Sequence, residues 1–305
     1  MRSLRAFASI LPLLSLTAVA GAQVEPSPAG EPLLESGVRV QGLLFDNFFQ
    51  LPDDADGDDV QALEVEGRIA WRPGPDAPLE VFGTAGALFY SDDISESPGL
   101  GVGVRRNARP SSFELVAELF LDRPSLDVGD TFDQADVLRL AGQYGYRVTA
   151  DWELTAMGEL QRQEFERASG RDNDFLLGGG AVRYRGWGYD LSPEVGVEIG
   201  ERDADDPNED HEQTEIWLKL RSVPTPPLYL SLRLRSRSRD YSVGDPAASN
   251  FGREDDRVQV ALTADCTVTE LLALTLYYAW EDADSTKPDR RFTTQLLALG
   301  TRWSF

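Results

Sequence analysis

The most constraining feature of the chain is an alternation of apolar and polar residues with a period of two. It is clearest between Leu228 and Arg235, where every even-numbered residue is leucine and the odd-numbered residues are Tyr, Ser, Arg and Arg. Successive side chains on a β-strand point to opposite faces, so this strand has one apolar face and one polar face. A fold that contains it needs an apolar environment on one side and water on the other.

The same pattern returns along the chain in segments of about ten residues separated by turn-forming residues. Apolar residues in these segments alternate with Glu, Arg, Gln, Thr or Gly. A triple glycine at 178–180 leaves open which face is which in the eighth segment. We predict strands at 38–48, 63–71, 79–90, 100–107, 113–121, 138–147, 152–161, 175–187, 194–199, 215–221, 228–235, 257–263, 272–280 and 292–305.

The connections between these segments alternate between long acidic stretches and short turns. The long ones lie near 50–60, 91–99, 122–136, 164–174, 201–213, 239–256 and 281–291, and the short ones at 73–78, 108–111, 149–151, 186–190, 223–227 and 265–270. Transmembrane β-barrels have short turns at one end and longer loops at the other. We therefore predict an all-β fold, a closed antiparallel up-and-down transmembrane β-barrel of about 14 strands, with both chain ends on one side.

A soluble β-sandwich is the alternative fold, since it also consists of many short strands. In a sandwich, however, one face of each strand is buried in a packed core. Here the face opposite the apolar one carries Glu, Arg, Lys or Gln on almost every strand. Burying so many charges in a dry core would cost several kcal/mol for each ion, whereas a water-filled lumen removes this cost.

The N-terminus has the features of an export signal. Arg2 and Arg5 precede an apolar run at 6–20, and the sequence Ala-Gly-Ala at 20–22 offers a cleavage site. The run is shorter than the ~20 residues of a spanning helix. We predict a signal peptide at 1–22, a short periplasmic N-terminal segment at 23–36 and the transmembrane barrel at 37–305.

Composition restricts the chemistry that the mature chain can carry out. Residues 23–305 contain 27 basic and 52 acidic residues, a balance that argues against nucleic acid as a partner. His211 is the one histidine and Cys266 the one cysteine. An enzyme with a histidine base would depend on His211, for which Asp210 is a weak partner, and we predict a solvated loop histidine instead. We expect no enzymatic activity, no cofactor and no metal site, and we interpret the acidic clusters at 53–59 and 203–210 as solvated loop charge.

The C-terminus resembles that of Gram-negative outer-membrane β-barrels. Leu297, Leu299, Thr301, Trp303 and Phe305 alternate with other residues, and the chain stops at the aromatic Phe305. The resemblance, to porin-like barrels of about 14 strands and to no particular subfamily, covers residues 37–305. It implies recognition of the last strand by the barrel-assembly machinery and contact with outer-membrane lipid and lipopolysaccharide. Aromatic residues that fit interfacial girdles are Trp71, Tyr146, Trp152, Tyr278, Trp280, Trp303 and Phe305.

The predicted inner face carries charges of both signs on different strands. Four arginines at 233, 235, 237 and 239 share one strand face at about 7 Å spacing. Glutamates lie mostly on other strands. The residues that we predict to line the pore are Arg233, Arg235, Arg237, Arg239, Lys219, Arg257, Glu64, Glu66, Glu114, Glu118, Glu153 and Glu159.

Two interpretations of these charges remain open at the level of sequence. A basic wall facing an acidic wall produces a transverse field across a pore, and the expected function is then an outer-membrane pore for small polar or ionic solutes. Alternatively, the charges pair across neighbouring strands and stiffen the wall, as Glu215 could do with an arginine of 228–235. The alternative function is a structural or export and assembly accessory barrel without general pore activity.

Overall fold

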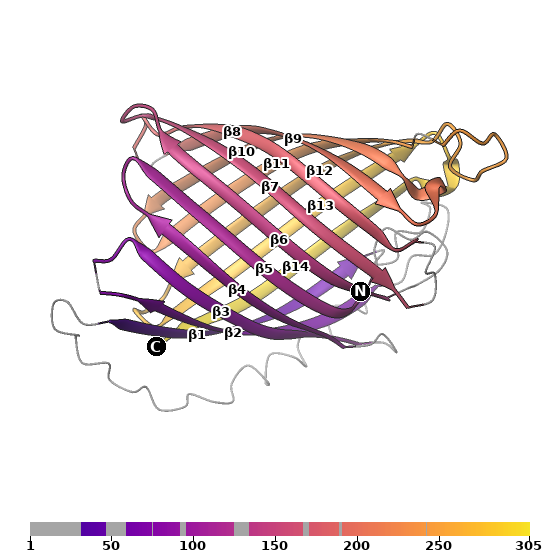
Figure 1. Ribbon diagram of the computed structural model, residues 1–305. Helices are drawn as coiled ribbons and strands as arrows, with labels where there is room; N and C mark the ends of the chain where they lie inside the picture. The colour runs from indigo at the N-terminus through magenta and orange to yellow at the C-terminus, as the bar shows by residue number, and fades with distance from the viewer. Residues whose placement is uncertain are drawn as a thin grey trace.

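The computed structural model is a closed barrel of fourteen antiparallel strands, in which each strand pairs with its sequence neighbours and β1 pairs with β14. It describes residues 32–46, 59–74, 76–91, 96–124, 134–166, 171–188, 191–241 and 243–305. The predicted fold class and strand number are confirmed. Both the start of β1 and the end of β14 lie at the end of the barrel with the shorter connections, here called the short-turn end; the opposite end is the loop end (Figure 1).

The strands are long and even in length. Their bounds are β1 Leu33–Asp46, β2 Val60–Arg72, β3 Leu79–Tyr90, β4 Ser97–Asn107, β5 Ser111–Pro124, β6 Gln134–Arg147, β7 Trp152–Phe165, β8 Asn173–Tyr184, β9 Ser192–Ala204, β10 His211–Thr225, β11 Leu228–Asp240, β12 Glu254–Thr267, β13 Leu272–Ser285 and β14 Phe292–Ser304. Two short 3-10 helices, η3 at Pro207–Glu209 and η4 at Pro288–Arg290, lie in connections at the loop end.

Exposure alternates along each strand in the way that the sequence predicts. On β12, Val258 is 48% exposed and Leu262 is 40% exposed, whereas Arg257 and Ala261 are each 7% exposed. The large apolar side chains of β12 therefore face outward, whereas Arg257 and the small Ala261 face the lumen. An exposed apolar belt is stable only against lipid, so this alternation identifies the outer surface as a membrane-facing one. Among the residues that the structure describes, no helix has the length and apolar character needed to cross a membrane.

Several strands reach further toward the loop end than predicted. The segments 201–213, 239–256 and 281–291 were expected to be loops, yet β9 continues to Ala204, β10 begins at His211, β11 ends at Asp240 and β13 ends at Ser285. Outward positions here carry acids rather than apolar residues. Backbone pairing continues beyond the lipid layer, whereas the apolar-polar alternation, which depends on lipid, stops at its edge.

The N-terminal boundary of the barrel differs from the prediction. β1 begins at Leu33, four residues before the expected start at 37, because Leu33 to Ser36 pair in register with Arg72 to Ile69 of β2. The predicted signal peptide at 1–22 lies outside the described residues. The eighth strand, β8, ends at Tyr184, so Trp187 lies in the following turn. The triple glycine of β8 pairs regularly, with Gly178 opposite Gly158 of β7 and Ile199 of β9.

Aromatic side chains gather on the outer surface near the short-turn end. Trp71 is 42% exposed and Tyr146 is 45% exposed. Trp152 contacts Tyr184, with ring centroids 4.8 Å apart, and Tyr184 contacts Trp187 edge-on at 5.3 Å. Such rings suit the membrane interface, where an apolar body meets a polar headgroup layer.

The outward orientation of the apolar side chains leads to a stability prediction. Leu262→Arg places a charge in the lipid-facing belt, and we expect it to lower the free energy of unfolding by about 2–4 kcal/mol. Thr263→Arg, on the lumen side of the same strand, is the matched control and should change it by less than about 1 kcal/mol. Urea titration of the barrel in lipid vesicles measures both; equal costs at the two positions would contradict the assignment of the faces.

Candidate functional site: the charged lumen and its loop-end rim

The arginine ladder, Arg233, Arg235, Arg237 and Arg239 on β11, lies on the inner face of the barrel. Three of its members share one carboxylate on the neighbouring strand β10. Arg233 Nη2 lies 3.2 Å, Arg235 Nη1 3.5 Å and Arg237 Nε 3.2 Å from oxygens of Glu215, which is 3% exposed. The predicted pairing of Glu215 with β11 is thus confirmed. Arg235 also lies 3.8 Å from Glu281 of β13, which Arg257 of β12 contacts at 3.4 Å. The basic side chains of this wall therefore outnumber Glu215 and Glu281.

The indole ring of Trp217 packs against the first arginine of the ladder, Arg233. Trp217 of β10 is 5% exposed, and its ring lies so close over Gly196 of β9 that a Cβ there would be 2.4 Å from the ring. The indole N–H donates to Glu198 at 3.1 Å, and the Arg233 guanidinium lies 5.2 Å from the ring centroid. The glycine leaves the space in which the tryptophan packs against the wall, and the ring then limits the positions that Arg233 can take.

Two arginines bind four of the five glutamates of the acidic wall, which consists of Glu64, Glu66, Glu114, Glu118 and Glu159. Arg139 of β6 contacts Glu118 of β5 at 2.6 Å and Glu159 of β7 at 2.7 Å. Arg39 of β1 contacts Glu64 at 2.7 Å and Glu66 at 3.4 Å. Each arginine therefore leaves one negative charge in excess.

Glu114 of β5 adds to this excess. Among the residues that the structure describes, no hydrogen bond or ion pair involves its carboxylate, although Arg105 and Gln143 are its neighbours in register. The acidic wall consequently keeps a negative surplus, as the ladder keeps a positive one.

The two walls face one another across a shared cavity. Its volume is about 660 Å³, and its lining includes Arg233, Arg235 and Arg237 together with Glu66, Glu114, Glu118 and Glu159. β5 and β11 lie six strands apart in the closed order, close to diametrically opposite. Glu64 lines an adjoining hollow of about 250 Å³ with Arg39 and Glu66.

The remaining predicted residues lie elsewhere on the inner face. Arg239 donates to Gln213 at 3.0 Å and Arg257 contacts Glu281 at 3.4 Å, both toward the loop end. Lys219 and Glu153 lie toward the short-turn end, where Glu153 contacts Arg185 at 3.0 Å. Burial lowers the pKa of the Arg185 guanidinium in the β8–β9 turn, and the positive Arg147 and Arg221 lower it further against the attraction of Glu153.

A second buried carboxylate, Glu80 of β3, organises the opposite side of the short-turn end. It is 3% exposed and binds three arginines, Arg68, Arg72 at 2.9 Å and Arg105 at 3.0 Å. These ion pairs link β2, β3 and β4. Arg72 also contacts Glu35 of β1 at 3.1 Å, so these three arginines are matched by two carboxylates and one positive charge is in excess.

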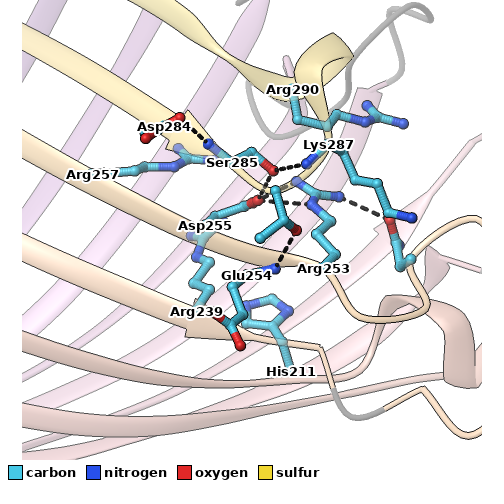
Figure 2. Close-up of polar contacts among 12 residues, drawn as sticks. His211, Arg239, Arg253, Glu254, Asp255, Arg257, Asp284, Ser285, Lys287 and Arg290 are labelled. Carbon is cyan, nitrogen blue, oxygen red and sulfur yellow. Dashed lines mark hydrogen bonds and ion pairs between the residues drawn. The ribbon is translucent and has the colours of Figure 1, made fainter.

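At the loop end, a buried polar network joins three connections into one rim (Figure 2). Arg253, just before β12, forms a two-pronged ion pair with Asp255 at 2.9 and 2.5 Å, and Ser285 of β13 donates to the same carboxylate at 2.7 Å. Asn250 accepts from Arg253 at 3.1 Å and donates to the Asn208 carbonyl at 2.8 Å. The connections β9–β10, β11–β12 and β13–β14 are thereby held together.

The solvated position predicted for His211 is wrong. It is 2% exposed at the start of β10, its ring lies 4.9 Å from that of Tyr241, and its Nδ1 lies 3.1 Å from the Glu209 carbonyl oxygen. The Asp210 carboxylate instead accepts from the Ala204 amide at 2.7 Å. The acidic neighbours in sequence suggested solvent, but β10 begins earlier than predicted and turns the imidazole inward.

Some lumen residues were missing from the predicted set. Arg139, Glu198, Glu215 and Trp217 all line or support the central cavity. Their strand parity alone places them inward, as it does the predicted residues. The choice of one carboxylate by three arginines depends on strand register, which sequence alternation does not specify.

Comparison with known proteins connects the chain to others through its fold. The sequence matches no protein-family model and no curated protein. Among solved structures, the outer-membrane-expressed OmpT of Vibrio cholerae is 11% identical with a TM-score of 0.50, covering 93% of this chain and 100% of that one. A bacterial polysaccharide outer-membrane secretin is 12% identical with a TM-score of 0.51, covering 88% and 98%. These likenesses show that the chain has the fold of bacterial outer-membrane β-barrels.

The shared carboxylate of the ladder leads to a second stability prediction. Glu215→Gln removes the one charge that holds three guanidinium groups together, and we expect the free energy of unfolding to fall by about 2–3 kcal/mol. Glu212→Gln, an exposed outward position on the same strand, should change it by less than about 0.5 kcal/mol. Urea unfolding followed by gel mobility compares them; an indistinguishable pair would rule out Glu215 as the organising group.

The rim network leads to a third prediction. Asp255→Asn removes the charged partner of Arg253, and amide hydrogen exchange over 250–254 should become about tenfold faster, because a charge-assisted hydrogen bond is worth more than 1 kcal/mol. Asp256→Asn, the exposed next residue, is the control. Unchanged exchange in the Asp255 variant would mean that the loops are held by other contacts.

Proposed function

We propose that this barrel is an outer-membrane pore that passes small polar or ionic solutes through its charged lumen. The proposal rests on one observation, the open volume of about 660 Å³ lined by arginines on one side and glutamates on the other. A barrel with a purely structural interior would be filled by packed side chains and would leave no cavity of this size.

The charge balance of the two walls supports this role. Glu215 is shared by three arginines of the ladder, and Arg139 and Arg39 are each shared by two glutamates of the acidic wall. In these contacts acids and bases are unequal in number, with more bases near β11 and more acids near β5. Separated surpluses produce a field across the water between them. A dipolar solute crossing this region is oriented with its negative end toward β11 and its positive end toward β5.

The proposal includes the outer membrane as the site of action, in agreement with the two structurally similar proteins, which are both outer-membrane proteins. Outer-membrane lipid and lipopolysaccharide would surround the apolar belt. The last strand would present Phe305 to the barrel-assembly machinery. In the folded protein this residue extends the β1–β14 pairing, because its amide donates to the Ser36 carbonyl at 2.7 Å and its carbonyl accepts from the Ser36 amide at 3.1 Å.

An accessory barrel without pore activity is the competing proposal, and conductance separates the two. The purified, folded barrel should conduct when it is inserted into a planar bilayer. A preparation that inserts, resists unfolding like a native barrel and never conducts would favour the accessory role.

Ion selectivity gives the sharper test. Arg235→Gln removes one positive charge from the cavity, and we expect the cation-to-anion permeability ratio, measured from reversal potentials in a salt gradient, to rise on the order of twofold. Arg162→Gln is the control, because Arg162 lies at an outward position of β7 and its side chain is 61% exposed. Equal ratios in wild type and Arg235→Gln would contradict the proposed role of the ladder.

A further inference from the structure

A row of charged side chains crosses six strands in register near the short-turn end. Arg147 of β6 is opposite Glu153 of β7, which is opposite Arg183 of β8. Arg183 is opposite Glu194 of β9, Glu194 is opposite Lys219 of β10, and Lys219 is opposite Arg233 of β11. Bases and acids alternate along the row until the last step, where two bases meet.

At the end of this row, Lys219 has no carboxylate as an ion-pair partner among the described residues. Glu194, the acidic neighbour of Lys219, lies 2.8 Å from Arg221 and 3.7 Å from Arg183. Arg233, on the other side, is held by Glu215. Across the described part of the chain, no hydrogen bond or ion pair involves the Lys219 ammonium.

The surroundings of Lys219 carry a positive surplus. Near this part of the row there are five basic side chains but only two acidic ones. The group comprises Arg147, Arg183, Arg185, Lys219, Arg221, Glu153 and Glu194. Like charges placed directly opposite one another on a sheet are destabilising, so the Lys219–Arg233 pair has a cost that a bound anion would offset.

We propose that Lys219, with Arg221 and Arg183, forms a subsite for an anionic group, a carboxylate or phosphate, of the transported solute. The inference rests on the proposed pore function and deepens it, since it assigns a class of solute and a stopping point. Lys219 supplies three donors on a flexible stem, and the two arginines supply planar forks that suit carboxylate and phosphate oxygens.

The subsite continues the arginine ladder toward the short-turn end. Lys219 is opposite Arg233, so an anion can pass from one base to the next without leaving positive surroundings. Anionic solutes are thereby given a path along β10 and β11, and the subsite is the part of this path nearest the short turns. A multivalent anion that enters from that end meets the subsite before it meets the ladder.

Current block in a planar bilayer tests this arrangement. Citrate, added on the side of the short turns, should block wild-type current, and Lys219→Gln should raise the blocking concentration about tenfold, as expected for loss of one charge-assisted contact. Lys219→Arg should retain the block. Lys287→Gln changes the other lysine of the chain, which lies in the β13–β14 connection at the loop end, and should leave the block unchanged. Equal block of wild type and Lys219→Gln in conducting channels would overturn the subsite.

Chemical protection supplies a readout that does not need conductance. The chain has two lysines, so acetylation of the folded barrel in detergent by acetic anhydride, followed by mass spectrometry, reports Lys219 and Lys287 separately. Citrate should slow acetylation of Lys219 severalfold and leave Lys287 unaffected. Protection of Lys219 in a barrel that never conducts would support the subsite and overturn the pore, whereas conduction with no protection would overturn the subsite alone.

Discussion

Closure of the backbone hydrogen-bond network is the constraint on which the rest of the structure depends. In lipid an unpaired amide or carbonyl costs several kcal/mol, so a sheet that crosses a membrane has no free edge. Here β1 pairs with β14 along ten residues, from Gly37 opposite Ser304 to Asp46 opposite Gln295. The terminal Phe305 adds two further backbone bonds to Ser36. Once the sheet is closed, every strand has one face toward lipid and one toward the lumen, and the period-two alternation follows.

The inner face carries many charged side chains beside water, and their positions have to be fixed. They are fixed by ion pairs in which one charged group contacts several opposite charges on neighbouring strands. Glu215 is shared by three arginines of β11, Glu80 by arginines of β2 and β4, and Arg139 by glutamates of β5 and β7. Sharing fixes the side chains but leaves each cluster with a net charge. The surpluses are positive on β10 and β11 and negative near β5, so the same contacts that stiffen the wall also polarise the lumen.

The sequence predicted those parts of the structure that lipid dictates. Leu228 to Arg235 fixed the faces of β11 without reference to any partner, and the strand number followed from repetition of the same rhythm. Above the lipid layer this signal is absent, and there the prediction ended strands too early and left His211 in a loop. The ion pairs of the lumen also escaped prediction in detail, because alternation specifies a face, whereas the partners of Glu215 or Arg139 depend on register.

In this structure lipid surrounds the apolar face of each strand, and water fills the barrel. Site-by-site cysteine labelling along β11 in lipid vesicles, on a Cys266→Ser background, tests it most directly. A water-soluble maleimide should label cysteines placed at 229, 231, 233 and 235 and leave those at 228, 230, 232 and 234 largely unreacted. Labelling of the even-numbered positions with protection of the odd-numbered ones would place the leucines in water and contradict the account.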